Sequence, residues 1–597
     1  MPEFCGIEPA GAHALLQAMA DAAGPASYLA RRVPSGMSEA GADLDGSAQA
    51  ADQALRRYQS FLDSWAQDLR WRIQYIEAMT GGSAFDHTRH TADLPYQSVQ
   101  QAQQQGAAAG KAEGRRLKQL WSQRQKNPLA PSQLAAELAK LGPYRYEPHY
   151  AGALLKALGK DAFHEILATH ISPTAGAAEA NGDGKGLRRL REEVGPLADL
   201  FAAADRGGTL PMSVRNEALS GLQPHELAIF LRLSDGHSDR FALDAARHIL
   251  DAPLGPFSGP DASDRAATRL ILLKELERRP GVVQLLLRER KYTRALFLPD
   301  IVYFGRLGAY QKELAAVLRG ALADETGGLA GRQQAWTNLI KVGGEKPIRQ
   351  MMAQSPDLAK ALVERMKPYI PWLSFMAGSN AANFSPAEVA KYAPHTPMIP
   401  GLNNKQEDFF PDVRNFLAGL ISNGDGRKAL MTAAYGNMDE HPALSPAAIE
   451  RLRHLNSHDG QSRFWQDVNG AQATETGFVG LLLRAGKVAQ IDHDAQVDFV
   501  NDLLGIGAGY IPGVNNPVVG FGIKYVLNDP QHKMAEWLVA DNTDPRLWDE
   551  VQKKYMEKLR KQLADAHLGY TEGDYRNLAN AYIALSLKAL QDDKAKN

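Results

Sequence analysis

The sequence predicts an all-α protein. Three observations support this: helix-forming Ala, Leu, Arg, Gln and Glu occur in long runs, alternating Val, Ile, Thr and Tyr stretches typical of strands are almost absent, and apolar residues recur every three or four positions. We expect a long N-terminal helical hairpin, then a multi-helix body, then a helical C-terminal domain. The predicted domains are residues 1–130, 131–470 and 471–597.

The composition is that of a globular chain with balanced charge. Of 597 residues, 44% are hydrophobic and 23% are charged, and the formal net charge is -1. A protein that binds nucleic acid over a broad surface would be basic, so we expect no nucleic-acid partner. The single cysteine, Cys5, excludes an internal disulfide and a thiolate metal cluster.

Two helices are expected in the first 80 residues. The first is predicted over residues 8–32, and Pro34-Ser35-Gly36 is expected to break the chain before a longer helix over residues 39–79. The apolar residues of the longer helix follow a near-heptad spacing and form a seam: Leu44, Ala48, Ala51, Leu55, Tyr58, Leu62, Trp65, Leu69, Ile73 and Ile76. Such a seam needs an opposing helix, either residues 8–32 or a helix of another chain, and the short connection favours residues 8–32.

Shorter helices are expected in the body. Residues 96–121 are rich in Gln and Ala, and we expect a solvated, loosely packed helix there. From residue 132 to about residue 470, helices punctuated by Pro and Gly follow one another without a repeating period. Several should begin at a proline, whose missing N–H costs nothing in a first turn: Pro148, Pro224, Pro386 and Pro446.

The longest uncharged stretch covers residues 503–523. Pro512, Gly513 and Pro517 divide it into two arms, each too short to cross a bilayer as a helix. We therefore expect two buried helices joined by a turn, and no integral membrane span.

No motif of a catalytic or phosphate-binding site is convincing. His164-Glu165 is similar to the start of a zinc-protease helix, but the second histidine is replaced by Ala168, and His170 lies on another face. The glycine-rich stretches 181–186 and 505–509 do not follow a strand, as a phosphate-binding loop would. Cys5, expected at a frayed terminus, makes a poor nucleophile.

Two groups of side chains could be weak metal ligands. His87 and His90 have helical spacing, but surface histidines are the favoured interpretation. Asp494, Asp498 and Asp502 would share one helix face, where a solvated acidic stripe is favoured. We therefore predict no catalytic residue, no cofactor and no metal, and we lean against an enzyme.

Four segments stand out in order along the chain: residues 5–16 (CGIEPAGAHALL), 61–73 (FLDSWAQDLRWRI), 146–159 (YEPHYAGALLKALG) and 502–513 (DLLGIGAGYIPG). Together they resemble a group of actinobacterial proteins associated with type VII (ESX) secretion and polymorphic toxins, whose N-terminal modules are WXG-like helical hairpins. The Trp-x-Gly turn of the small secreted hairpin proteins is absent, and Pro34-Ser35-Gly36 stands in its place.

The resemblance implies an exported or cell-surface helical scaffold, partnered by a small helical-hairpin protein or by secretion machinery. The N-terminus lacks the positive charge and apolar run of a secretory signal peptide. Export from the cytoplasm would therefore use another route. The group's export pattern, Tyr-x-x-x-Asp/Glu, assigns Tyr570 and Asp574 as a possible signal, and the same pattern occurs at residues 435–439 and 525–529.

Our leading hypothesis is a non-enzymatic interaction protein of a type VII secretion or polymorphic-toxin system, with homo-oligomers also possible. One alternative is a toxin whose activity, membrane-active or catalytic, lies in residues 471–597. Another is a phage- or virion-like structural protein. In the leading hypothesis the N-terminal helices contact a helical partner through Leu55, Tyr58, Leu62, Trp65, Leu69 and Ile73.

Overall fold

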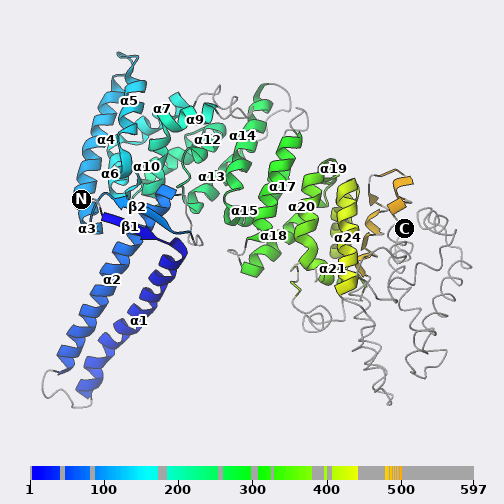
Figure 1. Ribbon diagram of the computed structural model, residues 1–597, viewed down its shortest axis with the longest axis horizontal. Coiled ribbons are helices and arrows are strands. Elements are labelled where there is room, and N and C mark those ends of the chain that lie inside the picture. The colour runs from blue at the N-terminus through cyan, green and yellow to red at the C-terminus, as the bar shows by residue number, and fades with distance from the viewer. Residues whose placement is uncertain are drawn as a thin grey trace, which may run out of the picture. The chain divides into compact units, whose positions relative to one another are not determined.

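The computed structural model confirms the all-α class: the described residues form 22 α-helices and one two-stranded sheet. The chain divides into two compact units, unit 1 (Met1–Arg278) and unit 2 (Arg279–Asn597), which are described separately (Figure 1). The boundaries predicted after residues 130 and 470 stay predictions. The structure describes residues 3–39, 47–80, 88–171, 185–252, 260–297, 307–324, 328–378, 396–397, 399, 406–440 and scattered residues between 477 and 499.

Unit 1 begins with a long antiparallel helical hairpin, called the arm below. It consists of α1 (Pro9–Glu39) and α2 (Ser47–Thr80), which pack against each other along the arm (Figure 1). The predicted hairpin is present, but α1 continues through Pro34-Ser35-Gly36, and α2 begins later than predicted. Packing on a partner helix stabilises a helix more than local propensity does, which explains why the helix-breaking triplet is overridden.

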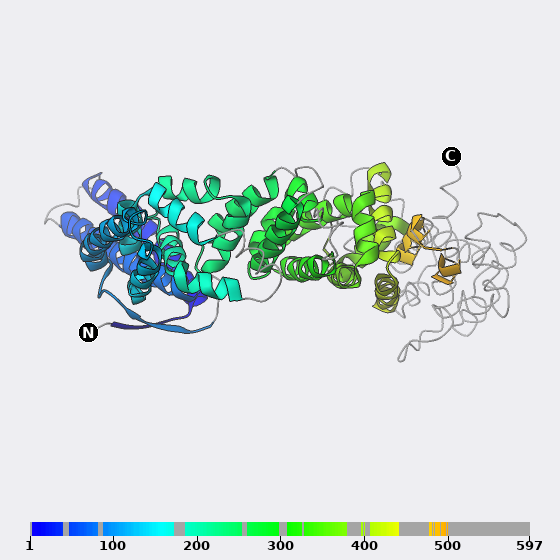
Figure 2. The same ribbon diagram turned by 90° about the horizontal axis from the view of Figure 1, so that it is seen from above.

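A two-stranded antiparallel sheet lies at the base of the arm (Figure 2). Its strands are β1 (Glu3–Ile7) and β2 (His90–Leu94), and Cys5 is paired with Ala92. Because β1 precedes α1 and β2 follows α2, their pairing joins the two ends of the arm. The prediction of a frayed terminus at Cys5 is therefore wrong.

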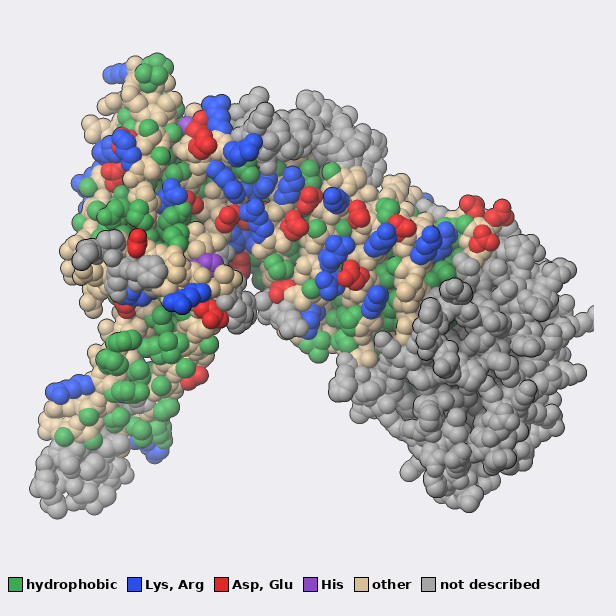
Figure 3. Space-filling model, viewed as in Figure 1, with side chains coloured by type: hydrophobic (Ala, Val, Ile, Leu, Met, Phe, Trp, Pro, Cys, Tyr) green, Lys and Arg blue, Asp and Glu red, His purple; other side chains and the backbone are tan. Residues whose placement is uncertain are grey.

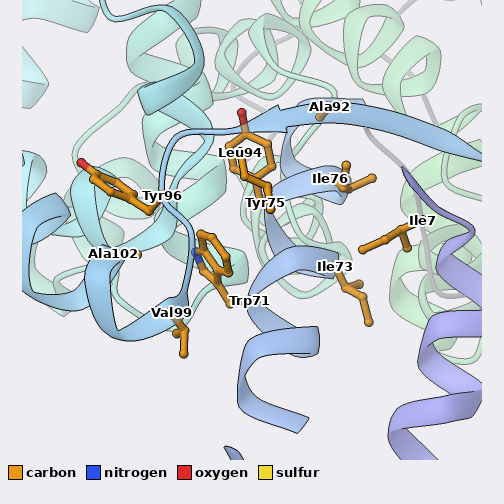
Figure 4. Close-up of a cluster of buried hydrophobic side chains, with 10 residues drawn as sticks. All are labelled: Ile7, Trp71, Ile73, Tyr75, Ile76, Ala92, Leu94, Tyr96, Val99 and Ala102. Atoms are coloured by element: carbon orange, nitrogen blue, oxygen red, sulfur yellow. The ribbon is translucent and has the colours of Figure 1, made fainter. Parts of the chain in front are cut away.

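A hydrophobic core closes the base of the arm (Figure 4). It combines side chains from the end of α2, from both strands and from the chain after β2. The Tyr75 hydroxyl also donates a hydrogen bond to the Asp93 carbonyl, at 3.1 Å. The buried residues are Ile7, Trp71, Ile73, Tyr75, Ile76, Ala92, Leu94, Tyr96, Val99 and Ala102.

The rest of unit 1 is a stack of shorter helices. Proline begins α6 and α12, as predicted at Pro148 and Pro224, whereas Pro386 and Pro446 lie outside the described residues. The helices are α3 (Val99–Gln101), the π-helix η1 (Ala102–Gly106), α4 (Ala107–Ser122), α5 (Ala130–Ala139), the 3-10 helix η2 (Gly142–Tyr146), α6 (Pro148–Leu158), α7 (Lys160–His170), α9 (Lys185–Glu193), α10 (Gly195–Arg206), α11 (Met212–Ser220), α12 (Pro224–Leu233), α13 (Asp239–Asp251) and α14 (Pro260–Leu276).

The Gln- and Ala-rich segment packs closely, contrary to the prediction of a loosely packed helix. A Cβ atom added to Gly110 of α4 would lie 2.1 Å from the Tyr150 carbonyl oxygen of α6. One added to Gly114 would lie 2.3 Å from the Leu154 carbonyl oxygen. Because glycine has no side chain, the two helix backbones can approach to this distance. The polar composition of the segment hid a glycine stripe that forms one of the main helix contacts of unit 1.

Unit 2 is also built from stacked helices. Within it α17 packs against α20, α19 against α23, and α20 against α24. Large apolar side chains, including Trp336, Trp372 and Phe416, are buried between them. The helices are α15 (Pro280–Leu287), α16 (Arg290–Phe297), α17 (Leu307–Ala323), α18 (Gly328–Gly343), α19 (Lys346–Gln354), α20 (Pro356–Met366), the 3-10 helix η4 (Lys367–Tyr369), α21 (Ile370–Gly378), α23 (Gln406–Ile421) and α24 (Gly424–Glu440).

Two predictions for the C-terminal part fall outside the described residues: the hairpin at 503–523 and the export signal at Tyr570 and Asp574. Among the helices that are described, none has the length and hydrophobicity that a membrane crossing requires.

Candidate interaction surface

The first helix of the arm carries two apolar stripes instead of one. Its inner stripe consists of Ala12, Leu16, Met19 and Ala23, which are half-buried. The second stripe has the same alternating spacing of three and four residues and is exposed throughout. An ordinary surface helix has an apolar arc of about 100°, whereas the two stripes together span roughly 200° at 3.6 residues per turn. The exposed residues are Gly11, Leu15, Ala18, Ala22, Pro25 and Leu29.

The second helix divides the predicted seam in two. Leu55, Leu62 and Leu69, seven residues apart, are half-buried on the side that α1 covers. Tyr58 and Trp65, also seven apart, are 49% and 61% exposed. Phe61 lies between them, 55% exposed, and its ring packs against Trp65 at a centroid distance of 5.5 Å. The seam therefore serves two purposes: one half pairs with α1, and the other half is open to solvent.

The exposed stripes of α1 and α2 lie on the same side of the arm. In each helix an exposed residue directly precedes an inner one, as Leu15 precedes Leu16 and Phe61 precedes Leu62. Successive side chains of a helix are about 100° apart around its axis, so each exposed stripe lies about 100° from the inner stripe of the same helix. Because the helices are antiparallel and their inner stripes face each other, both exposed stripes lie on the same side of the arm. Hydrophobic side chains gather over both helices of the arm in Figure 3. We call this surface the outer face: Gly11, Leu15, Ala18, Ala22, Pro25, Leu29, Tyr58, Phe61 and Trp65.

The outer face is large for a surface that stays in water. Three half-exposed aromatic side chains of about 150–250 Å² each leave roughly 300 Å² open. Leu15 and Leu29, 54% and 45% exposed, add to this area. The total reaches the range of about 300–600 Å² found for the largest apolar patch of a typical monomer, a range in which patches are often functional.

The predicted interface residues thus have three different positions. Tyr58 and Trp65 lie on the outer face, and Leu55, Leu62 and Leu69 line the contact with α1. Ile73 is 1% exposed and belongs to the core at the base of the arm, so it cannot contact a partner. The wrong assignment of Ile73 arose because a near-heptad spacing continues without change from the free arm into the core.

The near-heptad spacing of α2 indicated neither Phe61 nor the exposed stripe of α1. A signal for the latter was present in the sequence: the steps of 4, 3, 4, 3 and 4 between residues 11, 15, 18, 22, 25 and 29 repeat the pattern of the predicted seam. It was hidden because glycine, alanine and proline fill four of the six positions.

An ionic contact links the base of the arm to the rest of unit 1. Glu77 of α2 is 6% exposed, and its carboxylate accepts hydrogen bonds from Arg206 of α10 (3.1 Å) and pairs with His13 of α1 (2.8 Å). The same guanidinium donates to the carbonyl oxygens of Gly236 and His237. A buried carboxylate is stabilised by a paired cation or by hydrogen-bond donors, and Arg206 supplies both to Glu77, so this contact joins the base of the arm to α10.

A second buried carboxylate lies beside this junction. Glu147 caps α6, accepting from the backbone N–H groups of His149 (3.1 Å) and Tyr150 (2.6 Å) and from Trp71 Nε1 of α2 (3.0 Å). Burial raises the pKa of Glu147 to about 7, although the three hydrogen bonds oppose this shift. The hydrogen bond from Trp71 to Glu147 therefore joins the arm to α6 without a cationic side chain.

The other candidate groups do not come together as a site. His164 pairs with Glu217 of α11, and His170 pairs with Glu193 of α9, so each histidine links two helices. His87 and Asp502 lie outside the described residues. Within the part of the chain that the structure describes, no group of three or more His, Cys, Asp or Glu side chains could hold a metal ion.

Comparison of the chain with protein-family models, with curated proteins and with solved structures found no match.

Proposed function

We propose that the protein is a non-enzymatic helical scaffold of a type VII secretion or polymorphic-toxin system, and that its arm holds a helical partner. The secretion context, with export to the cell surface or medium, rests on the resemblance of the four segments named above. The partner in that context would be a small helical-hairpin protein or a component of the secretion machinery.

The observation that carries the binding role is the outer face. Three aromatic side chains about half exposed lie beside an uncharged stripe of six residues on the arm, whose base packs on the other helices of unit 1. A two-helix apolar surface of this kind fits helices of a partner, because their side chains can enter the grooves between its own. Aromatic residues at the centre of such surfaces commonly supply most of the binding free energy.

Affinity capture of the full-length protein from its host tests the proposal. The double variant Tyr58→Asp/Trp65→Asp should lose a helical partner that the wild type captures and that rebinds the purified wild type. The matched control is Ser60→Asp/Gln67→Asp, with the same spacing on exposed positions of the opposite side of α2. A partner retained by both variants would contradict the proposal. A dedicated inhibitor bound to residues 471–597 would instead support a toxin.

A further inference from the structure

The outer face is uncharged, which suits a surface that meets a copy of itself. None of its nine residues has an acidic or basic side chain that is charged near neutral pH. When two identical surfaces meet about a two-fold axis, residue i of one copy contacts residue j of the other, and a charge at i meets repulsion or is desolvated without a partner unless j carries the opposite charge. A neutral face avoids this repulsion altogether.

The register of the arm shows which residues would meet. His13 and Glu77 are joined at 2.8 Å, so they lie at one level. Both helices rise by about 1.5 Å per residue, and counting twelve residues along each from this pair brings Pro25 level with Trp65. Four further residues bring Leu29 level with Phe61. With the two-fold axis parallel to the arm, α1 of one copy faces α2 of the other at the same level.

In that arrangement the contacts are complementary. Trp65 of one copy covers Pro25 of the other, and Phe61 covers Leu29, and each pair occurs twice. Flat aromatic rings thus meet small or aliphatic side chains rather than each other.

The size of the outer face fits a weak self-association. It runs from Gly11 to Leu29, about 27 Å along α1. Two such faces of roughly 300–600 Å² each would together bury about 600–1,200 Å², the size of a weak or transient interface.

We propose that, without another partner, the protein pairs with a second copy of itself through the outer faces of the two arms, forming a four-helix bundle. The inference rests on the proposed function, since it names an occupant of the same surface. A helical partner would then have to displace the second arm, so self-pairing and partner binding compete.

Sedimentation velocity or light scattering of the full-length protein at about 1–100 μM, a range that brackets micromolar association, tests the self-pairing. We expect a dimer for the wild type and for Ser60→Asp/Gln67→Asp, and a dissociation constant raised more than about tenfold in Tyr58→Asp/Trp65→Asp. Circular dichroism establishes that each variant is folded. A wild-type monomer throughout this range, or a dimer unaffected by the Tyr58 and Trp65 changes, would overturn the inference.

A cross-link tests the arrangement without disturbing the rest of the face. In a Cys5→Ser background, Pro25→Cys/Trp65→Cys should form a disulfide-linked dimer on mild oxidation. Within one copy both side chains point to the same side of the arm, so their Cα atoms are about as far apart as the helix axes, 8–10 Å, which is too far for a disulfide. Across the proposed interface the two side chains would point toward each other, which brings their Cα atoms closer. The control Gly24→Cys/Gln67→Cys, with both positions off the outer face, should remain monomeric. Equal cross-linking of both pairs would contradict the bundle.

The two proposals fail separately. A monomer that still captures a helical partner through Tyr58 and Trp65 overturns the self-pairing alone. A dimer lost in the Tyr58 and Trp65 variant, while partner capture persists, overturns the assignment of the outer face to that partner and leaves the self-pairing intact.

Discussion

At the scale of single residues, burial without a cation gives Glu147 an electrostatic cost that an experiment can isolate. Its carboxylate is fully buried, accepts three hydrogen bonds and has no cationic partner among them. Burial therefore raises its pKa to about 7, from the 4.5 of an exposed glutamate. The folded chain keeps this proton to a higher pH than the unfolded chain does.

The pH dependence of stability follows from the higher pKa of Glu147 in the folded chain. Since the folded state binds more protons between pH 4.5 and about 7, the contribution of Glu147 is most favourable below pH 4.5 and is lost as the pH rises to about 7. The folded and unfolded pKa values of Glu147 differ by about 2.5. At 1.36 kcal/mol for each pH unit, the lost contribution to the unfolding free energy is about 3 kcal/mol. In Glu147→Gln, whose side chain does not titrate, this contribution should be absent, so the unfolding free energy should fall less from pH 4.5 to 7 than in the wild type. Urea unfolding at several pH values measures it.

Glu137→Gln is the matched control for this experiment. Its carboxylate lies nearer the surface, and hydrogen bonds from Lys140 and Arg116 lower its pKa below 4.5. Its titration therefore lies outside the window, and the slope between pH 4.5 and 7 should match the wild type. A difference in unfolding free energy between wild type and Glu147→Gln that stays constant through the window would contradict the assignment to Glu147.

The sequence could not have indicated this residue. Glu147 precedes Pro148, which marks a helix start, and an acceptor at that position is ordinary. Its other partner, Trp71, is 76 residues away, and only the packing of α2 on α6 removes the carboxylate from water. Spacing predicts local partners such as caps, but it carries no information on contacts of this kind.

At the scale of elements, the close contact of α4 with α6 depends on two glycines. In Gly110→Ala the new methyl group would lie 2.1 Å from the Tyr150 carbonyl oxygen. Backbone cannot rotate away as a side chain can, so the helices must separate. We expect unfolding free energy to fall by about 1–3 kcal/mol or more, and circular dichroism during urea unfolding measures this.

Gly24→Ala in α1 supplies the control, because nothing lies within 4 Å of the Cβ position there. Relief of the helix penalty of glycine should leave stability unchanged or raise it by up to about 1 kcal/mol. If Gly110→Ala behaved like Gly24→Ala, the close approach of α4 and α6 would be wrong.

Periodicity predicted elements better than it predicted their surroundings. The apolar spacing of residues 39–79 gave α2 nearly to its end, because one repeat persists there for many turns. The same repeat could not separate Leu62, which faces α1, from Trp65, which faces solvent, since both satisfy it. The stripe of small residues on α1 and the glycines of α4 were missed because apolar periodicity weights large side chains.

At the scale of the whole molecule, unit 1 and unit 2 each bury their own apolar core. In unit 1, α14 packs against α12 and α13 and completes that core. Its residues Leu270, Ile271, Leu273 and Leu276 are at most 6% exposed. At about 1.5–3 kcal/mol for each such side chain, their burial is comparable to the 5–15 kcal/mol that stabilises a whole domain. The end of unit 1 should therefore lie after α14, and not in the connection before it.

Two fragments that differ by α14 test this boundary. A fragment of residues 1–278 should be helical, monodisperse or dimeric, and unfold cooperatively in urea. A fragment of residues 1–252 would expose the apolar surface of α12 to water, so it should bind a hydrophobic dye, aggregate or unfold at a clearly lower urea concentration. Equal stability of the two fragments would mean that α14 is not part of the core of unit 1. A fragment of residues 1–278 that fails to fold, alongside a full chain that does, would mean that the two units depend on each other for stability.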